Sequence, residues 1–198
     1  MESSYNSKEN EFKLITKNNE KISLGINIGS LNTVYSIFGK NEKKYITNVL
    51  LSDVSKRVIP SQICYSDTHR LYGDTASALM RKFSDYSYSN LSRLIGFNYD
   101  INIYKQEIDI YFKYGTFNPE NKKFKISNDK NKKKEVSSSI IIADYLSLIN
   151  KFYFDKKKKE ENYKYDFVTF SVPDYYTAFQ KQELKSATPL PPVLSRSR

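Results

Sequence analysis

The chain has 198 residues, of which 39% are hydrophobic, and its 32 Lys and Arg against 22 Asp and Glu give a net charge of +10. That length suits a single domain. A lone cysteine, Cys64, and a lone histidine, His69, exclude an intrachain disulfide and argue against a zinc site. No apolar run reaches the ~20 residues of a membrane helix, and the polar residues 1–21 lack the apolar centre of a signal peptide. We therefore expect a mobile tail over 1–21, no membrane partner and a cytoplasmic location.

The first half of the chain predicts an antiparallel meander followed by short strands and helices. Apolar and polar residues alternate in its first segments, and the connections between these segments are too short for parallel pairing. Ala76, Leu79 and Phe83 recur at steps of three and four, which is the spacing of one helix face. The expected strands cover 22–28, 33–38, 44–50, 63–65 and the residues up to Tyr72, and the expected helices cover 73–83 and 89–95.

The second half predicts a small antiparallel sheet, a long buried helix, a central parallel strand and a final helix. Two adjacent apolar stripes indicate that the long helix is buried on a wide face. Thr177 and Gln180 have the spacing of a capping box at the start of the final helix. The expected strands cover 108–112, 124–126 and the nearly continuous apolar run 167–172, and the expected helices cover 136–154 and 177–187.

This order of elements predicts an α/β fold, with a mixed sheet flanked by helices and a small antiparallel subdomain. We expect the core sheet to be built from residues 22–95 and 165–187, which belong to one domain over 22–187. An inserted small subdomain is expected over 100–160. Three prolines in the tail 188–198 end any helix there.

Three segments carry a resemblance to a known family. Residues 57–76 read RVIPSQICYSDTHRLYGDTA, residues 93–96 read Arg-Leu-Ile-Gly, and residues 172–176 read Val-Pro-Asp-Tyr-Tyr. In this order they resemble the nucleotide-binding lobe of the 70-kDa heat-shock chaperones and their 110-kDa relatives. The resemblance covers residues 22–187 and implies the first lobe of an actin-like, ribonuclease-H-like ATPase, in a divergent and truncated form.

The resemblance implies a phosphate-binding turn directly after the first strand. Gly29 would allow a sharp turn whose N–H groups face phosphate oxygens, where a Cβ would be in the way. Read alone, the spacing of Gly25 and Gly29 is a weak signal for phosphate binding, and both could simply be the glycines of a β-hairpin. The nucleotide-binding and phosphate-binding positions that the resemblance implies are Asn27, Gly29, Ser30, Leu31 and Asn32.

Four positions of this candidate site depart from the family's pattern, and two of them are Ser30 and Leu31, which stand where the family has two threonines. The family's magnesium-associated carboxylate is Asn27 here, which keeps an acceptor oxygen but loses the charge that a hard cation needs. The family's catalytic lysine is Ser92, which supplies no cation during phosphoryl transfer. The resemblance therefore implies ATP or ADP with magnesium as cofactors, held weakly or not at all, with no catalytic residue and no metal ligand in this chain. Whether the chain is an enzyme stays open, and a chain without ATPase activity is favoured.

Three functions follow as hypotheses. The first is the ATP-binding lobe of an ATP-dependent chaperone or of a nucleotide-exchange partner, without catalytic activity in this chain. The second is a non-catalytic interaction module that binds a full-length chaperone or co-chaperone. The third is a basic nucleic-acid binder, suggested by the lysine runs, although no basic-aromatic motif is present and no specific nucleic acid is expected. We also expect partial exposure of four apolar side chains at the sheet, which are Ile26, Val168, Phe170 and Val172.

Overall fold

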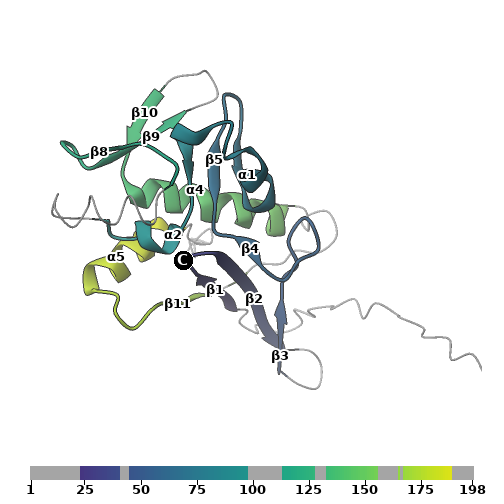
Figure 1. Ribbon diagram of the computed structural model, residues 1–198. Helices are drawn as coiled ribbons and strands as arrows, with labels where there is room; N and C mark the ends of the chain where they lie inside the picture. The colour runs from purple at the N-terminus through teal and green to yellow at the C-terminus, as the bar shows by residue number, and fades with distance from the viewer. Residues whose placement is uncertain are drawn as a thin grey trace, which may run out of the picture.

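The computed structural model describes residues 23–40, 45–97, 113–127, 133–155, 165 and 167–188, and Figure 1 shows their arrangement. At the centre lies a five-stranded mixed sheet in the order β11-β1-β2-β3, with β4 also paired to β2. β1 runs parallel to β11, and the other pairs are antiparallel, as the predicted meander requires. The strands are β1 (Ser23–Ile28), β2 (Asn32–Lys40), β3 (Tyr45–Val49), β4 (Ile59–Pro60) and β11 (Phe167–Ser171).

Two small antiparallel sheets accompany the main sheet, in the orders β6-β5-β7 and β10-β9-β8. In Figure 1 the helix α4 crosses the middle of the molecule, with the main sheet below it and the small sheets above it. The strands are β5 (Ile63–Tyr65), β6 (Arg70–Tyr72), β7 (Ser87–Tyr88), β8 (Phe117–Asn118), β9 (Lys123–Ser127) and β10 (Lys133–Val136). The helices are α1 (Gly73–Leu79), α2 (Leu91–Leu94), α4 (Ser138–Asn150) and α5 (Ala178–Ala187), with a 3-10 turn at Ser84–Tyr86 and a π-helical turn at Lys151–Asp155.

The long helix α4 is buried on the wide face that its two apolar stripes predicted. Its start, however, lies at Ser138 and not at Val136, because Val136 pairs with Phe124 in the β9–β10 ladder and is buried there. After Asn150 the backbone widens into the π-helical turn, within the range for which the sequence predicted a continuous helix. The predicted strand at 108–112 lies outside the described residues. The buried positions of α4 are Ser138, Ile141, Ile142, Tyr145, Leu146 and Ile149.

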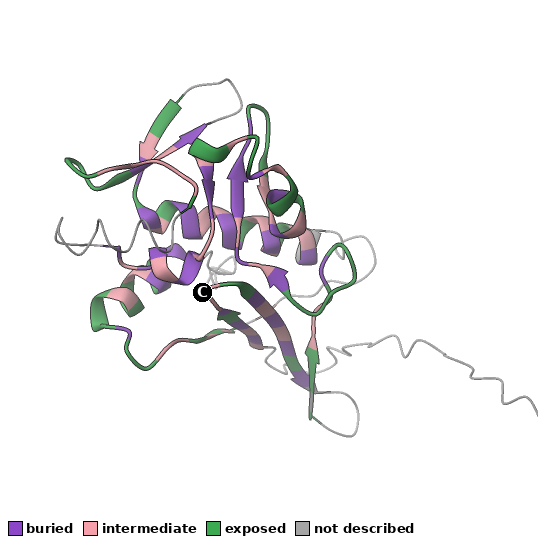
Figure 2. Ribbon diagram, viewed as in Figure 1, coloured by how far each residue is buried: buried purple, intermediate pink, exposed green. Residues whose placement is uncertain are grey.

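One face of the main sheet packs into the core, and alternate residues point away from it (Figure 2). Ile26 lies on the core face and is 4% exposed, so its expected exposure is wrong. The reason is that the core beneath this one face covers Ile26, whatever lies on the opposite face. Partial exposure is confirmed for Val168, Phe170 and Val172, which are half-buried. Among the described residues β11 pairs with β1 alone and alternates between exposed and half-buried side chains, unlike the central strand that was predicted.

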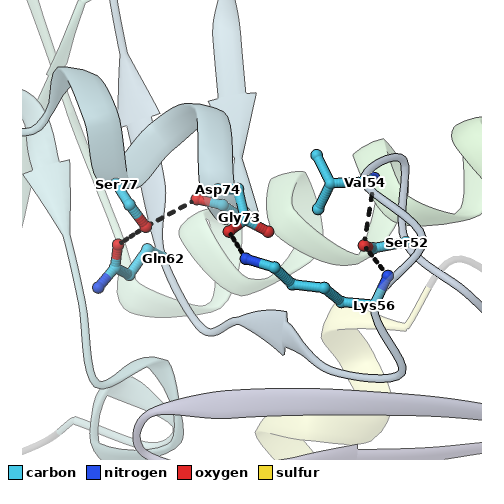
Figure 3. A network of polar contacts seen from close by, with 7 residues as sticks. All are labelled: Ser52, Val54, Lys56, Gln62, Gly73, Asp74 and Ser77. Atoms are coloured by element: carbon cyan, nitrogen blue, oxygen red, sulfur yellow. Dashed lines mark hydrogen bonds and ion pairs between the residues drawn. The ribbon is translucent and has the colours of Figure 1, made fainter.

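Polar contacts fix the loop before β4 to helix α1, as Figure 3 shows. The Ser52 hydroxyl accepts hydrogen bonds from the backbone N–H groups of Val54 and Lys56, at 3.3 and 3.1 Å. The Lys56 ammonium lies 2.7 Å from a carboxylate oxygen of Asp74 in the first turn of α1. Because the Lys56 side chain is largely exposed, this ion pair adds at most about 1 kcal/mol. Ser77 donates to the Gly73 carbonyl at 3.0 Å and to the side-chain oxygen of Gln62.

Tyr35 on β2 is fully buried, with its ring centroid 5.6 Å from that of Tyr153, and its hydroxyl has no hydrogen-bond partner within the described chain. Burial raises the pKa of this hydroxyl well above its ordinary value. We expect Tyr35→Phe to leave the free energy of unfolding unchanged or to raise it by up to about 1 kcal/mol, because an unpaired buried hydroxyl costs desolvation energy. Urea denaturation measures the change.

The matched control is Tyr145→Phe, because the Tyr145 hydroxyl donates to the Pro60 carbonyl at 3.2 Å. This control should lose about 1 kcal/mol. An equal loss in Tyr35→Phe would contradict the expectation, because it would mean that the Tyr35 hydroxyl also makes a stabilising contact.

Candidate phosphate-binding site

The turn between β1 and β2 is tight, and its geometry explains Gly29. The Gly29 N–H donates to the Asn32 carbonyl at 2.9 Å. A Cβ at Gly29 would lie 2.7 Å from that same carbonyl oxygen, which is closer than real Cβ atoms approach. Since β1 and β2 pair directly across this turn, the hairpin interpretation of Gly29 is correct as a description of structure. It does not decide what the turn binds.

The Pro-Ser pair at 60–61 lies against one side of this turn. The Ser61 N–H donates to the Leu31 carbonyl at 2.8 Å, and the Ser61 hydroxyl lies 2.8 Å from the Thr33 hydroxyl in a buried contact. β4 brings these residues here by pairing with the start of β2, where Asn32 faces Pro60. The first segment of the resemblance is therefore in contact with the turn.

Helix α2 contacts the turn through Ser92. The hydroxyl oxygens of Ser30 and Ser92 lie 3.0 Å apart, close enough for either to donate to the other. Ser92 is 3% exposed, and its carbonyl accepts a hydrogen bond of 2.5 Å from the Tyr176 hydroxyl. The chain that follows β11 thus meets α2 at the same residue that meets the turn. The third segment of the resemblance therefore contacts the residue that directly precedes the second.

The start of α5 fixes the far end of α2. The predicted capping box is confirmed, since the Thr177 hydroxyl accepts from the Gln180 N–H at 3.2 Å and the Gln180 side chain accepts from the Thr177 N–H at 3.0 Å. The Gln180 amide nitrogen also donates to the Ile95 carbonyl at 3.2 Å. Gly96 has a φ of +68° and leaves room for Gln180 against the backbone.

The structure gathers some of the predicted site residues and leaves others at the surface. Gly29, Ser30 and Ser92 are in one contact network. The Asn27 side chain is exposed, and its oxygen lies 3.9 Å from where a Gly29 Cβ would lie. The Leu31 side chain is 73% exposed, and only its carbonyl contributes to the network. The side chain of Asn32 is exposed as well.

Sequence reasoning missed two contributors, Ser61 and Tyr176. Both stand in segments that carry the resemblance, but no spacing rule links them to the turn. The one signal was Tyr176 itself, because a buried tyrosine hydroxyl usually has a hydrogen-bond partner. That hydroxyl is the group that bonds to the Ser92 carbonyl.

The chemistry of these groups does not fit a bound magnesium nucleotide. The joined side chains of Ser30 and Ser92 end in hydroxyls and the exposed Asn27 on the adjoining strand ends in an amide, whereas Mg²⁺ prefers anionic oxygens and phosphates prefer cations. In the described part of the chain, no group of three or more His, Cys, Asp and Glu residues could hold a metal ion. The nearest basic side chain in α2, Arg93, has its guanidinium carbon 5.6 Å from the centroid of the Tyr175 ring.

A mixed sheet with a tight first hairpin, met by a short helix and by the end of a parallel strand, defines an α/β protein with its candidate site at that hairpin. The model of the Hsp70 protein family matches residues 23–191. The chain therefore belongs to the Hsp70 family, and the resemblance predicted from the three segments is confirmed. Among the described residues no helix is both long enough and apolar enough to span a bilayer.

Proposed function

We propose that this chain is the actin-like, ribonuclease-H-like first lobe of a heat-shock chaperone-family protein and that it does not hydrolyse ATP. The main support for the proposal is Ser92. The resemblance assigns a lysine to this position, whereas Ser92 has a hydroxyl that is hydrogen-bonded to Ser30. The lobe would cover residues 22–187, and its nucleotide affinity would be weak or absent. We also propose that the protein is located in the cytoplasm.

Phosphoryl transfer depends on positioned cations, because charge develops on the transferred group and its leaving oxygen. The loss of one such electrostatic contact commonly lowers the rate by about 10²- to 10³-fold. Here the lysine and the carboxylate associated with magnesium are both replaced by neutral side chains, at Ser92 and Asn27. Both losses act on the same step, so turnover should fall below detection.

The expected result is that the purified chain releases no phosphate from Mg-ATP above a heat-inactivated sample of the same preparation. A mock purification from cells without the chain controls for contaminating ATPases. Phosphate release that exceeds both controls, and that scales with the concentration of the chain, would overturn the proposed inactivity.

A second candidate function, an interaction module for a full-length chaperone or co-chaperone, is favoured by the partly exposed apolar strand β11. Val168 and Phe170 are half-buried on its core face, where a partner could complete their burial. The same assay tests this function if a purified full-length 70-kDa chaperone is added. The chain should then change the chaperone's turnover in proportion to the amount added, and an unchanged rate would count against this role.

A further inference from the structure

The turn and α2 are connected by a direct contact between two hydroxyl groups, which we call the Ser30–Ser92 hydroxyl bridge. We propose that this bridge closes the site without any ligand, and that a phosphate group has to break it to enter. The proposal rests on the proposed function, since it concerns the turn that the Hsp70 resemblance assigns to phosphate. It adds that this chain holds its turn closed with its own side chains.

Both ends of the bridge are anchored from outside it. On the turn, the residues on either side of Ser30 are fixed by backbone hydrogen bonds, from Gly29 to the Asn32 carbonyl and from Ser61 to the Leu31 carbonyl. On α2, the 2.5 Å hydrogen bond from Tyr176 fixes the Ser92 carbonyl. A contact between two anchored groups loses little conformational entropy when it forms, so it can persist without a ligand.

The separation of 3.0 Å leaves no space for another atom between the two hydroxyl oxygens. A phosphate oxygen at this point would have to accept hydrogen bonds from one or both hydroxyls. The hydrogen bond between the two hydroxyls would then be lost. The hydroxyls of Ser30 and Ser92 offer no positive charge that would compensate a phosphate for its lost hydration. The bridge is therefore favoured over the phosphate complex at this position.

Hydrogen exchange of the full chain tests the bridge. In Ser92→Ala, the backbone amides of the turn peptide 29–33 should exchange about fivefold faster, which corresponds to one lost hydrogen bond of about 1 kcal/mol. Ser30→Ala should give a similar increase. The double variant should add nothing further, because both substitutions remove the same contact. Alanine fits the buried Ser92 position without added volume, so the fold should persist.

The matched control is Ser139→Ala, which breaks an exposed hydroxyl pair with Ser137 of similar length, 2.9 Å, at the start of α4. It should leave exchange in peptide 29–33 unchanged. Wild-type exchange rates in Ser92→Ala would overturn the proposal, and so would an equal acceleration in Ser139→Ala, which would indicate a global loss of stability.

A second arm measures the affinity for Mg-ATP by calorimetry, with Mg-ATP as the probe. If the phosphate has to break the bridge, Ser92→Ala should bind about fivefold more tightly than the wild type. Equal or weaker binding by the variant would contradict the requirement that phosphate break the bridge. If neither protein binds Mg-ATP, nucleotide binding fails as part of the proposed function. The statement that a phosphate has to break the bridge fails with it. The exchange experiment then decides by itself whether the bridge closes the turn.

Discussion

Gly96→Ala is expected to lower the free energy of unfolding by about 2–4 kcal/mol. Two effects add. The φ of +68° lies in the left-handed region, which costs an L-residue about 1–2 kcal/mol. The new Cβ would also lie 2.5 Å from Cγ and 3.0 Å from Cα of Gln180, so the start of α5 would have to move. Urea denaturation with far-UV circular dichroism measures the loss.

A suitable control is Gly25→Ala in β1, whose Cβ would lie 2.6 Å from the Ser36 hydroxyl oxygen. That oxygen is the end of a side chain that can rotate away, and the backbone of Gly25 is ordinary strand, so the loss should be clearly smaller. If Gly96→Ala cost no more than Gly25→Ala, the close packing of α2 against Gln180 would not stabilise the fold.

Gly96 also illustrates which features of the fold the sequence could predict. The sequence predicted a helix over 89–95, ending before Gly96, of which the structure forms Leu91–Leu94, and Thr177 with Gln180 predicted the start of α5. Such predictions succeed because they depend on contacts between residues close in sequence. The antiparallel meander was likewise predictable, from alternation and short connections. The apolar run 167–172 predicted a strand, whereas β11 beside β1 alternates between exposed and half-buried side chains.

Features that depend on distant contacts were not predictable. Val136 has the apolar spacing of the following helix, but its pairing with Phe124 places it in a strand. Ile26 was expected to be partly exposed, but the core under one face of the main sheet, built from distant segments, covers it. β4 has two residues, too few for any periodicity, and it forms because Ile59 and Pro60 meet the start of β2.

The candidate site also has features that the sequence predicted and features that it did not. Its turn and the replacements at Asn27 and Ser92 were readable from the resemblance, because they stand at fixed positions in motifs. The bridge from Ser30 to Ser92 joins residues that are 62 positions apart, and the Tyr176 contact with Ser92 joins residues 84 positions apart. Whether two such residues touch depends on the packing of the sheet, α2 and α5, and no local pattern encodes it.

A second large loss is expected for Asp144→Ala in α4. Asp144 accepts hydrogen bonds from the Tyr65 hydroxyl at 2.9 Å and from the Arg70 guanidinium at 2.7 Å, and so ties α4 to β5 and β6. Tyr65 is fully buried, and its hydroxyl would lose the carboxylate that accepts its hydrogen bond. The free energy of unfolding should fall by about 2 kcal/mol. Because Arg70 is substantially exposed, little of this loss comes from its charge.

A double-mutant cycle with Tyr65→Phe separates the two partners of Asp144. If the buried Tyr65 hydroxyl is the main reason for the loss, Asp144→Ala should cost about 1 kcal/mol less in the Tyr65→Phe background than in the wild type. Asp144→Asn keeps an acceptor oxygen for Tyr65 and removes the charge that faces Arg70, so it should retain most of the stability. Additive losses across the cycle, or an equal loss in Asp144→Asn, would instead assign the contribution to the ion pair with Arg70.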